Sequence, residues 1–262
     1  MNRAHNAEDA LICVQLAKLY FDNITIDLIY GTPSLTNNKW EQNVETAISL
    51  HVPHLSCYAL TVEPKTPLQK LIQQHKSENI DPGKQAEQFL LLMKWLNKAG
   101  YEHYEISNFA KPGFRSRHNS SYWQGKKYYG FGPSAHSFDG KARWWNVSNN
   151  TIYIESIEKG IIPLEKEELT ATQQLNEYIM ISLRTVEGLD LRKAGQFNEQ
   201  PATSDSQRED NRENETTIVV KLLKESKKYI DSGLMIFKNN RLALTNEGKL
   251  MADGIAADLF LD

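Results

Sequence analysis

The order of apolar and polar residues predicts a mixed α/β protein in the first part of the chain. A helix begins after Asn6, a residue type that caps helix N-termini, and acidic side chains occupy its first turn. The β-branched run that ends at Gly31 has the composition of a strand. The same criteria predict helices at 6–20, 36–50 and 85–99, and strands at 24–30, 54–62 and 101–107. Because no hairpin signal separates the strands, we expect right-handed crossovers and a parallel sheet.

The pattern changes after residue 108. Residues 108–153 are rich in aromatic, Gly and Asn residues and show little periodicity, which indicates a long ordered loop region with short strands. Stretches of this kind in compact proteins usually carry function. A helix returns at 169–184. Residues 198–216 are acidic and polar with Ala202 as their one apolar residue, so we expect a solvated or disordered insertion there.

The last part of the chain predicts a hairpin and a closing helix. Two apolar runs flank Asn239 and Asn240, and Asn tolerates the positive φ that a tight hairpin turn requires. The closing helix is expected at about 246–261. Helices followed by a hairpin resemble a winged helix, a form that often binds DNA. The acidic insertion and the lack of a Lys/Arg stripe favour structural packing instead.

Charge and composition exclude several classes of protein. The 262 residues include 30 Lys and Arg against 33 Asp and Glu, a net charge of −3, so there is no basic field to attract nucleic acid. The longest apolar run, 89–93, is far too short to span a membrane, and the first residues show no signal-peptide pattern. We therefore expect a cytoplasmic protein. With only Cys13 and Cys57, the chain has neither a disulfide framework nor a four-thiolate metal site.

Two features suggest ligand contacts in the predicted strands and loops. Asp27 is a carboxylate flanked by apolar residues toward the end of a parallel strand, where α/β folds place ligand contacts, although it could equally cap a loop amide. The segment 130–135, Gly-Phe-Gly-Pro-Ser-Ala, formally fits a dinucleotide fingerprint. We reject that interpretation because Pro133 and the residues after it do not open a long helix. The glycines indicate a close backbone approach to a ligand, or merely a tight turn.

A third feature is His118-Asn-Ser-Ser-Tyr-Trp123, which places an imidazole beside an amide and two aromatic rings. Imidazole binds iron well, and flat aromatic surface suits a planar macrocycle. A histidine of this kind taken alone is more often a hydrogen-bonded structural residue. His136 on the glycine-containing loop adds some weight to the functional interpretation.

Six segments together carry a family pattern: Asn-Arg-Ala-His at 2–5, Ile-Asp-Leu-Ile-Tyr-Gly at 26–31, Tyr-Ala-Leu-Thr-Val-Glu at 58–63, Tyr-Glu-Ile-Ser-Asn-Phe-Ala at 104–110, the 118–123 motif, and Gly-Phe-Gly-Pro-Ser-Ala-His-Ser at 130–137. In this order they resemble the radical S-adenosylmethionine enzymes of the oxygen-independent coproporphyrinogen III oxidase type. More narrowly, they are similar to the HemW-type heme chaperones of that family. The C-terminal segment 249–260 is similar as well.

The resemblance implies the fold and the division of the chain. It implies an α/β protein with a partial parallel (βα) barrel, followed by a helical, winged-helix-like C-terminal domain. The expected parts are the second half of a radical S-adenosylmethionine barrel at 1–110, an irregular ligand-binding loop region at 111–160, and the helical domain at 161–262, which contains the insertion 198–216.

The resemblance also implies ligands and the residues that bind them. The family binds a [4Fe–4S] cluster and S-adenosylmethionine, and the matching positions for adenosylmethionine contacts are Arg3, Asp27, Ala59 and the backbone around His136. The motif at 118–123 matches the heme-binding motif of the chaperone branch. It implies His118 as the axial iron ligand, with Asn119, Tyr122 and Trp123 beside the heme.

One departure from the family pattern is large. The family holds its cluster on a Cys-x-x-x-Cys-x-x-Cys motif near the N-terminus, and this chain starts inside the Arg-x-His motif that follows it. Cys13 and Cys57 cannot replace three clustered thiolates. We therefore expect no cleavage of adenosylmethionine by this polypeptide alone.

Three interpretations follow from the resemblance and the departure. The chain is the C-terminal portion of a HemW-type heme chaperone, or the same portion of a coproporphyrinogen oxidase, or a stand-alone porphyrin-binding module without radical chemistry. The 118–123 motif favours the first. The expected partners are heme or porphyrin, an acceptor hemoprotein and the missing N-terminal half. Nucleic acid is not an expected partner, whereas peripheral contact with a membrane is compatible with the chain.

Overall fold

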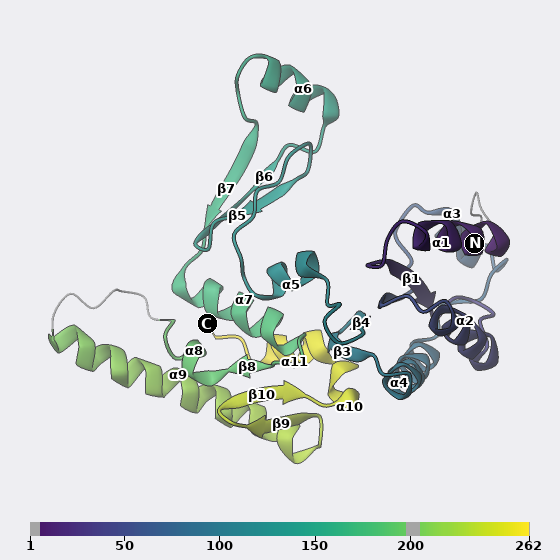
Figure 1. Cartoon of the computed structure of the whole chain (residues 1–262). Helices are drawn as coiled ribbons and strands as arrows, with labels where there is room; N and C mark the ends of the chain where they lie inside the picture. The colour runs from purple at the N-terminus through teal and green to yellow at the C-terminus, as the bar shows by residue number, and fades with distance from the viewer. Residues whose placement is uncertain (1–5, 198–204, 262) are drawn as a thin grey trace. The chain divides into compact units, whose positions relative to one another are not determined.

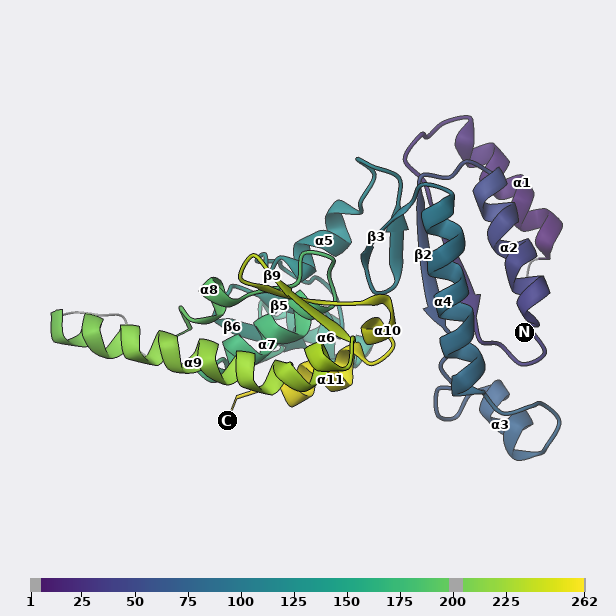
Figure 2. The same cartoon turned by 90° about the horizontal axis from the view of Figure 1, so that it is seen from below.

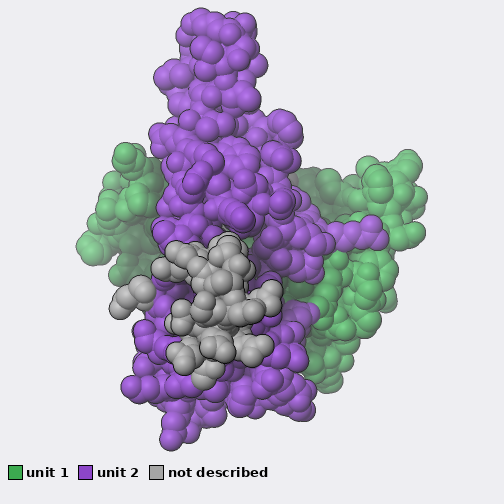
Figure 3. Space-filling model, turned by 90° about the vertical axis from the view of Figure 1, so that its left-hand side faces the viewer, with its two compact units in different colours: residues 1–116 green, residues 117–262 purple. Residues whose placement is uncertain are grey.

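The computed structural model describes residues 6–197 and 205–261, and only the backbone of 205–216 (Figure 1). It forms two compact units, residues 1–116 and 117–262, which Figure 3 draws in different colours. Each unit is described by itself below. Arg3, an expected adenosylmethionine contact, lies outside the described residues. The expected three-part division of the chain stays a prediction.

Unit 1 is built on a four-stranded mixed sheet with the strand order β1-β2-β4-β3. Strands β1 and β2 are parallel, and β4 is antiparallel to both of its neighbours. The elements are α1 (Ala7–Lys18), β1 (Thr25–Tyr30), α2 (Asn37–Ser49), β2 (His54–Ala59), α3 (Pro67–Gln73), α4 (Pro82–Lys98), β3 (Glu102–Glu105) and β4 (Asn108–Ala110).

The strand expected at 101–107 is present as β3 but ends at Glu105, and the expectation of a wholly parallel sheet is wrong, because only β1 and β2 are parallel. The segment turns at Ile106 and Ser107, and β3 and β4 pair as a hairpin with an irregular register. The Glu105 carboxylate stabilises the turn by accepting hydrogen bonds from the Ser107 backbone N–H, at 3.0 Å, and from the Asn108 side chain. Because side chains rather than a Gly or Asn signal close this turn, the sequence pattern did not reveal it.

The core of unit 1 lies between one face of the sheet and the helices α2 and α4, which run side by side (Figure 2). Trp40 and Leu92 are fully buried on these helices, against Leu55 of β2 and Phe109 of β4. Strand alternation places Asp27 and its partner Ser56 on the opposite face of the sheet. The helices therefore leave the polar face of the sheet free of their own side chains.

Helix α1 lies at the surface of unit 1. Asn6 caps its N-terminus, as predicted, in a capping box with Asp9, and none of its residues is buried. Its main described tie to the rest of the unit is a hydrogen bond of 2.6 Å from the Lys18 ammonium to the Leu50 carbonyl. Large apolar side chains on it and just after it are exposed: Leu11, Ile12, Leu16, Leu19, Tyr20 and Phe21.

Unit 2 contains two three-stranded antiparallel sheets, ordered β5-β6-β7 and β8-β10-β9. The first forms an arm with α6 at its tip, and α9 runs beside the second (Figure 1). The elements are α5 (Arg117–Trp123), β5 (His136–Phe138), β6 (Ala142–Asn146), α6 (Asn150–Glu158), β7 (Leu164–Glu168), α7 (Ala171–Leu183), β8 (Leu189–Asp190), α8 (Leu191–Ala194), α9 (Asp205–Asp231), β9 (Met235–Lys238), β10 (Arg241–Leu244), α10 (Asn246–Lys249) and α11 (Ala252–Asp258).

Several expectations for unit 2 can be compared with these elements. The hairpin around Asn239 and Asn240 is confirmed, and both residues have positive φ. The loop region 108–153 contains more regular structure than expected, including two helices. The closing helix divides into α10 and α11. Of the insertion at 198–216, residues 205–216 belong to α9, which differs from the expected disorder, and residues 198–204 lie outside the described residues.

Candidate ligand site

The 118–123 motif forms the short helix α5, and its register brings two of the predicted ligand residues together. His118 and Tyr122 are one helical turn apart, with ring centroids 5.1 Å apart and planes at 87°. His118 is exposed, and among the described contacts none engages its ring nitrogens. An exposed imidazole with free ring nitrogens can serve as an iron ligand.

The His118–Tyr122 pair continues into a row of aromatic rings. Tyr122 packs edge-on against Tyr128 at 4.9 Å, and Tyr128 lies 6.2 Å from Phe138 of β5. An isolated backbone bridge also joins Tyr128 to Phe138. Burial raises the pKa of the Tyr128 phenol above its ordinary value. The row presents aromatic surface from α5 to the sheet of the arm.

The other two motif residues have different surroundings. Trp123 lies under the guanidinium of Arg184, which is 5.4 Å from the centre of its ring and forms an ion pair with Asp253. The indole Nε1 atom is buried without a hydrogen-bond partner. Asn119 is partly buried. The contact with Arg184 gives Trp123 a packing role that anchors α5 on α7.

A pocket of about 430 Å³ opens beside α5 within unit 2. Its walls come from α5 and the turn after it, from β5 and β6, from α7, and from the segment around α8. Of the predicted ligand residues, Tyr122 lines this pocket, whereas His118, Asn119, Trp123 and His136 do not. Its size and its mixture of aromatic and charged groups are typical of small-molecule sites.

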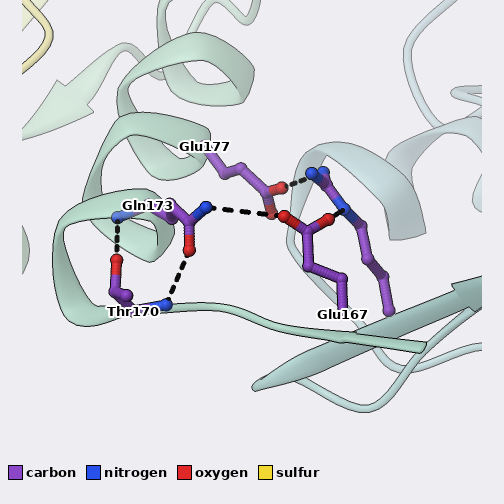
Figure 4. A network of polar contacts seen from close by, with 5 residues as sticks. Glu167, Thr170, Gln173 and Glu177 are labelled. Carbon is purple, nitrogen blue, oxygen red and sulfur yellow. Dashed lines mark hydrogen bonds and ion pairs between the residues drawn. The ribbon is translucent and has the colours of Figure 1, made fainter.

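Arg143 links three elements of the pocket region through two ion pairs. Its guanidinium contacts Glu167 of β7 at 2.7 Å and Glu177 of α7 at 2.6 Å. Figure 4 shows both glutamates, with the capping box of Thr170 and Gln173 at the start of α7 beside them. Burial raises the pKa of the Glu177 carboxyl, although Arg143 partly opposes that shift. The network therefore fixes β6 and β7 to α7 and neutralises the arginine.

The glycine-containing loop makes a tight turn before β5. A Cβ atom on Gly130 would lie 2.2 Å from the His136 carbonyl oxygen, so the chain passes close to itself here. His136 is exposed, and its ring lies 6.1 Å from that of Trp145. Phe131 is 90% exposed. The close approach at Gly130 is therefore internal, which is the tight-turn alternative of the sequence analysis.

In unit 1, the expected adenosylmethionine contacts Asp27 and Ala59 lie on neighbouring strands. Asp27 is exposed near the middle of β1 and is paired with Ser56, rather than standing at the strand end. Ala59 ends β2 opposite Tyr30, and strand alternation points its side chain to the other face of the sheet. The side chains of Asp27 and Ala59 therefore do not converge, and their expected roles stay predictions.

The residues present do not fit a [4Fe–4S] cluster. Cys13 is exposed on α1, and Cys57 is buried in β2, where burial raises the pKa of its thiol. The 6–197 and 205–261 ranges contain no group of three or more His, Cys, Asp or Glu side chains arranged to hold a metal ion. The described residues therefore offer no ligand set for such a cluster. Among its described helices, none combines the length and apolar character needed to cross a bilayer.

The sequence analysis missed most of the pocket. Lys126, Arg143, Glu177 and Lys193 all line it, and they come from four separate segments. The one local signal was the density of aromatic residues between Tyr122 and Phe131. The charged groups become neighbours only through the pairing of β5, β6 and β7 and the packing of α7.

Comparisons with known proteins agree with this architecture. Residues 169–251 match the family model described as the HemN C-terminal domain. The chain matches a solved structure of the coproporphyrinogen III oxidase HemN of Escherichia coli, a radical S-adenosylmethionine enzyme, with a TM-score of 0.71 and 17% identity over 99% of this chain and 60% of that one. In fold, the chain is thus an α/β protein of the radical S-adenosylmethionine HemN type.

Relatives that are similar in sequence indicate a smaller group within this class of proteins. The heme chaperone HemW of Bacillus subtilis is 35% identical over 74% of this chain and 52% of its own length. The heme chaperone HemW of Mycobacterium tuberculosis is 31% identical over 91% of this chain and 55% of its own length. The chain belongs to the HemN/HemW-like family of radical S-adenosylmethionine proteins. It spans about half the length of these curated relatives.

Proposed function

We propose that this chain is the C-terminal portion of a HemW-type heme chaperone, which binds heme on unit 2 and delivers it to acceptor hemoproteins in the cytoplasm. The observation that carries the proposal is the exposed His118 imidazole, whose ring packs against Tyr122 at the start of the aromatic row. Imidazole supplies an axial ligand for iron, and the row supplies flat surface for the macrocycle. The relatives named as heme chaperones support the same function.

The finer description of the fold belongs to this proposal. We interpret unit 1 as the second half of a (βα) barrel, because β1 is an edge strand of its sheet and could pair with further strands. The β8-β10-β9 sheet with α7 and α9 is interpreted as a winged-helix-like domain used for packing. In a complete protein, a [4Fe–4S] cluster would be held by thiolates outside this chain, and adenosylmethionine would contact Asp27, Ala59 and the backbone near His136.

A heme titration followed by absorbance tests the proposal. The chain should bind heme with the spectrum of histidine ligation, and His118→Ala should lose that spectrum. His75→Asn is the matched control: it changes an exposed histidine that follows α3 in unit 1 and should leave the spectrum intact. Identical spectra for wild type and His118→Ala would remove His118 from the site.

The alternative within the family is a coproporphyrinogen III oxidase, since residues 169–251 match a model named for HemN. An assay of the complete protein separates the two. A chaperone transfers heme to an apo-hemoprotein and releases no carbon dioxide from coproporphyrinogen, whereas an oxidase decarboxylates that substrate. A stand-alone porphyrin-binding module would bind heme without either activity when no further polypeptide is supplied.

A further inference from the structure

Two lysines of the unit 2 pocket carry charge that no described residue neutralises. Lys126 lies in the turn after α5, and Lys193 lies on α8. Both are exposed, and within the described parts of the chain neither forms an ion pair. The Lys193 ammonium lies over the ring of Tyr178, 4.4 Å from its centroid. Two unpaired cations at one pocket favour an anionic ligand.

The other charges of the pocket do not offset these lysines. Among the residues that line the pocket, Arg143 and Glu177 form an ion pair at 2.6 Å and carry opposite charges, whereas Glu167, the second partner of Arg143, does not line the pocket. The positive charge that remains for a ligand therefore belongs to the lysines. Lysine suits this role because its ammonium is a mobile point charge that can meet a carboxylate from several directions.

The remaining walls favour a flat, conjugated group. Tyr122, Tyr128 and Phe138 of the aromatic row line the pocket, and so do Tyr178 and Phe197, whose rings stack with centroids 5.5 Å apart. Aromatic walls bind planar groups through face and edge contacts. The pocket thus offers cations and aromatic surface within about 430 Å³.

We propose that this pocket binds the carboxylate-bearing edge of heme, with Lys126 and Lys193 as the carboxylate partners. The proposal deepens the proposed function and rests on it. His118 lies next to the pocket wall, because its ring packs against Tyr122 and Tyr122 lines the pocket. The proposal therefore places the iron of one macrocycle at His118 and its carboxylates at the two lysines, on either side of Tyr122.

The test compares heme with heme dimethyl ester, in which both carboxylates are neutral. Wild type should bind heme about tenfold more tightly than the ester. The double variant Lys126→Gln/Lys193→Gln should lose about tenfold in heme affinity, while its affinity for the ester stays within about twofold of wild type. Lys159→Gln/Lys238→Gln removes two exposed lysines outside the pocket and should change neither affinity.

The outcomes separate this proposal from the proposed function. If wild type binds heme through His118 but prefers the ester or binds both equally, the subsite is overturned and the chaperone proposal stands. Equal heme affinity of wild type and the pocket double variant overturns it as well. If wild type binds no heme, both proposals fail. The comparison of the two ligands on wild type needs no variant, so a folding defect cannot obscure the result.

Discussion

The side-chain carbonyl of Gln88 accepts a hydrogen bond of 2.8 Å from the backbone N–H of Gly31, 57 residues earlier in the chain. Gln88 is fully buried on α4, and its amide nitrogen donates to the Leu35 carbonyl at 3.0 Å. The backbone carbonyl of Gln88 accepts a third hydrogen bond, from the indole N–H of Trp40 at 3.1 Å. One buried glutamine therefore holds the loop that follows β1, the strand that carries Asp27.

Replacing Gln88 should destabilise unit 1. Gln88→Leu keeps the volume but leaves the Gly31 N–H without its partner, and an unsatisfied buried group costs about 1–3 kcal/mol. We expect a loss of about 2–4 kcal/mol in the free energy of unfolding, measured by urea denaturation. Gln42→Leu on the exposed side of α2 is the control and should shift stability by less than about 0.5 kcal/mol. Equal midpoints for the two variants would contradict this role.

His54 should make unit 1 sensitive to acid. Its ring is buried between the Thr25 hydroxyl and the Tyr104 hydroxyl, each at 2.7 Å, and burial lowers its pKa below the ordinary 6.5. Below pH 6.5 the unfolded chain therefore binds a proton that the folded chain does not, so stability falls as pH falls, by up to about 1.4 kcal/mol per pH unit. In urea denaturation between pH 7.5 and 5.5, His54→Gln should reduce this dependence.

The control for His54 is His51→Asn, which changes an exposed histidine three residues earlier. It should keep the acid sensitivity of the wild type. If His54→Gln and His51→Asn show the same pH dependence as wild type, a group other than His54 causes the acid sensitivity.

The sequence predicted those elements that depend on neighbouring residues or whose apolar residues recur with a clear helical or strand period. The strands around Asp27 and Cys57, the helix that carries Trp40, and the Asn239–Asn240 turn were all predicted, because each depends on its own residues. The β5-β6-β7 sheet was not resolved into strands, because its strands are short and bear charged and aromatic residues on both faces.

In the candidate site, too, residues within one segment were predicted, whereas residues from separate segments were not. The 118–123 motif identified His118 and Tyr122 from one contiguous segment, and the helix brings these two together. Lys126 and Lys193 lie far apart in the sequence and meet the same pocket only after α7 packs on the arm. Trp123, which the same motif assigns to heme, packs against Arg184, and its contact with heme stays a prediction.

Gly130 should tolerate no side chain. Gly130→Ala places a Cβ atom 2.2 Å from the His136 carbonyl oxygen, and both are backbone-constrained, so the loop must move. We expect a loss of about 2 kcal/mol or more in stability, seen as a lower Tm. Gly254→Ala in α11 is the matched control, because nothing lies within 4 Å of the added Cβ, and alanine should stabilise that helix by about 0.5–1 kcal/mol. The same sign of Tm shift for both would contradict the close approach.

Arg143 should stabilise unit 2 by keeping the Glu177 carboxylate charged. Arg143→Met leaves Glu177 facing the pocket with its pKa raised further, since burial already raises it and Arg143 is the opposing charge. The side chains are about 40% exposed, so water screens the pair and we expect a loss of only about 1–2 kcal/mol at pH 7. The loss should shrink as pH falls toward 4.5, because the folded variant then gains a proton at Glu177 before the unfolded chain does. Adding Glu177→Gln to Arg143→Met removes one of the two carboxylate charges that lose their partner, the other being Glu167, and should recover part of the lost stability. An additive double variant in urea denaturation would show that Arg143 and Glu177 act independently.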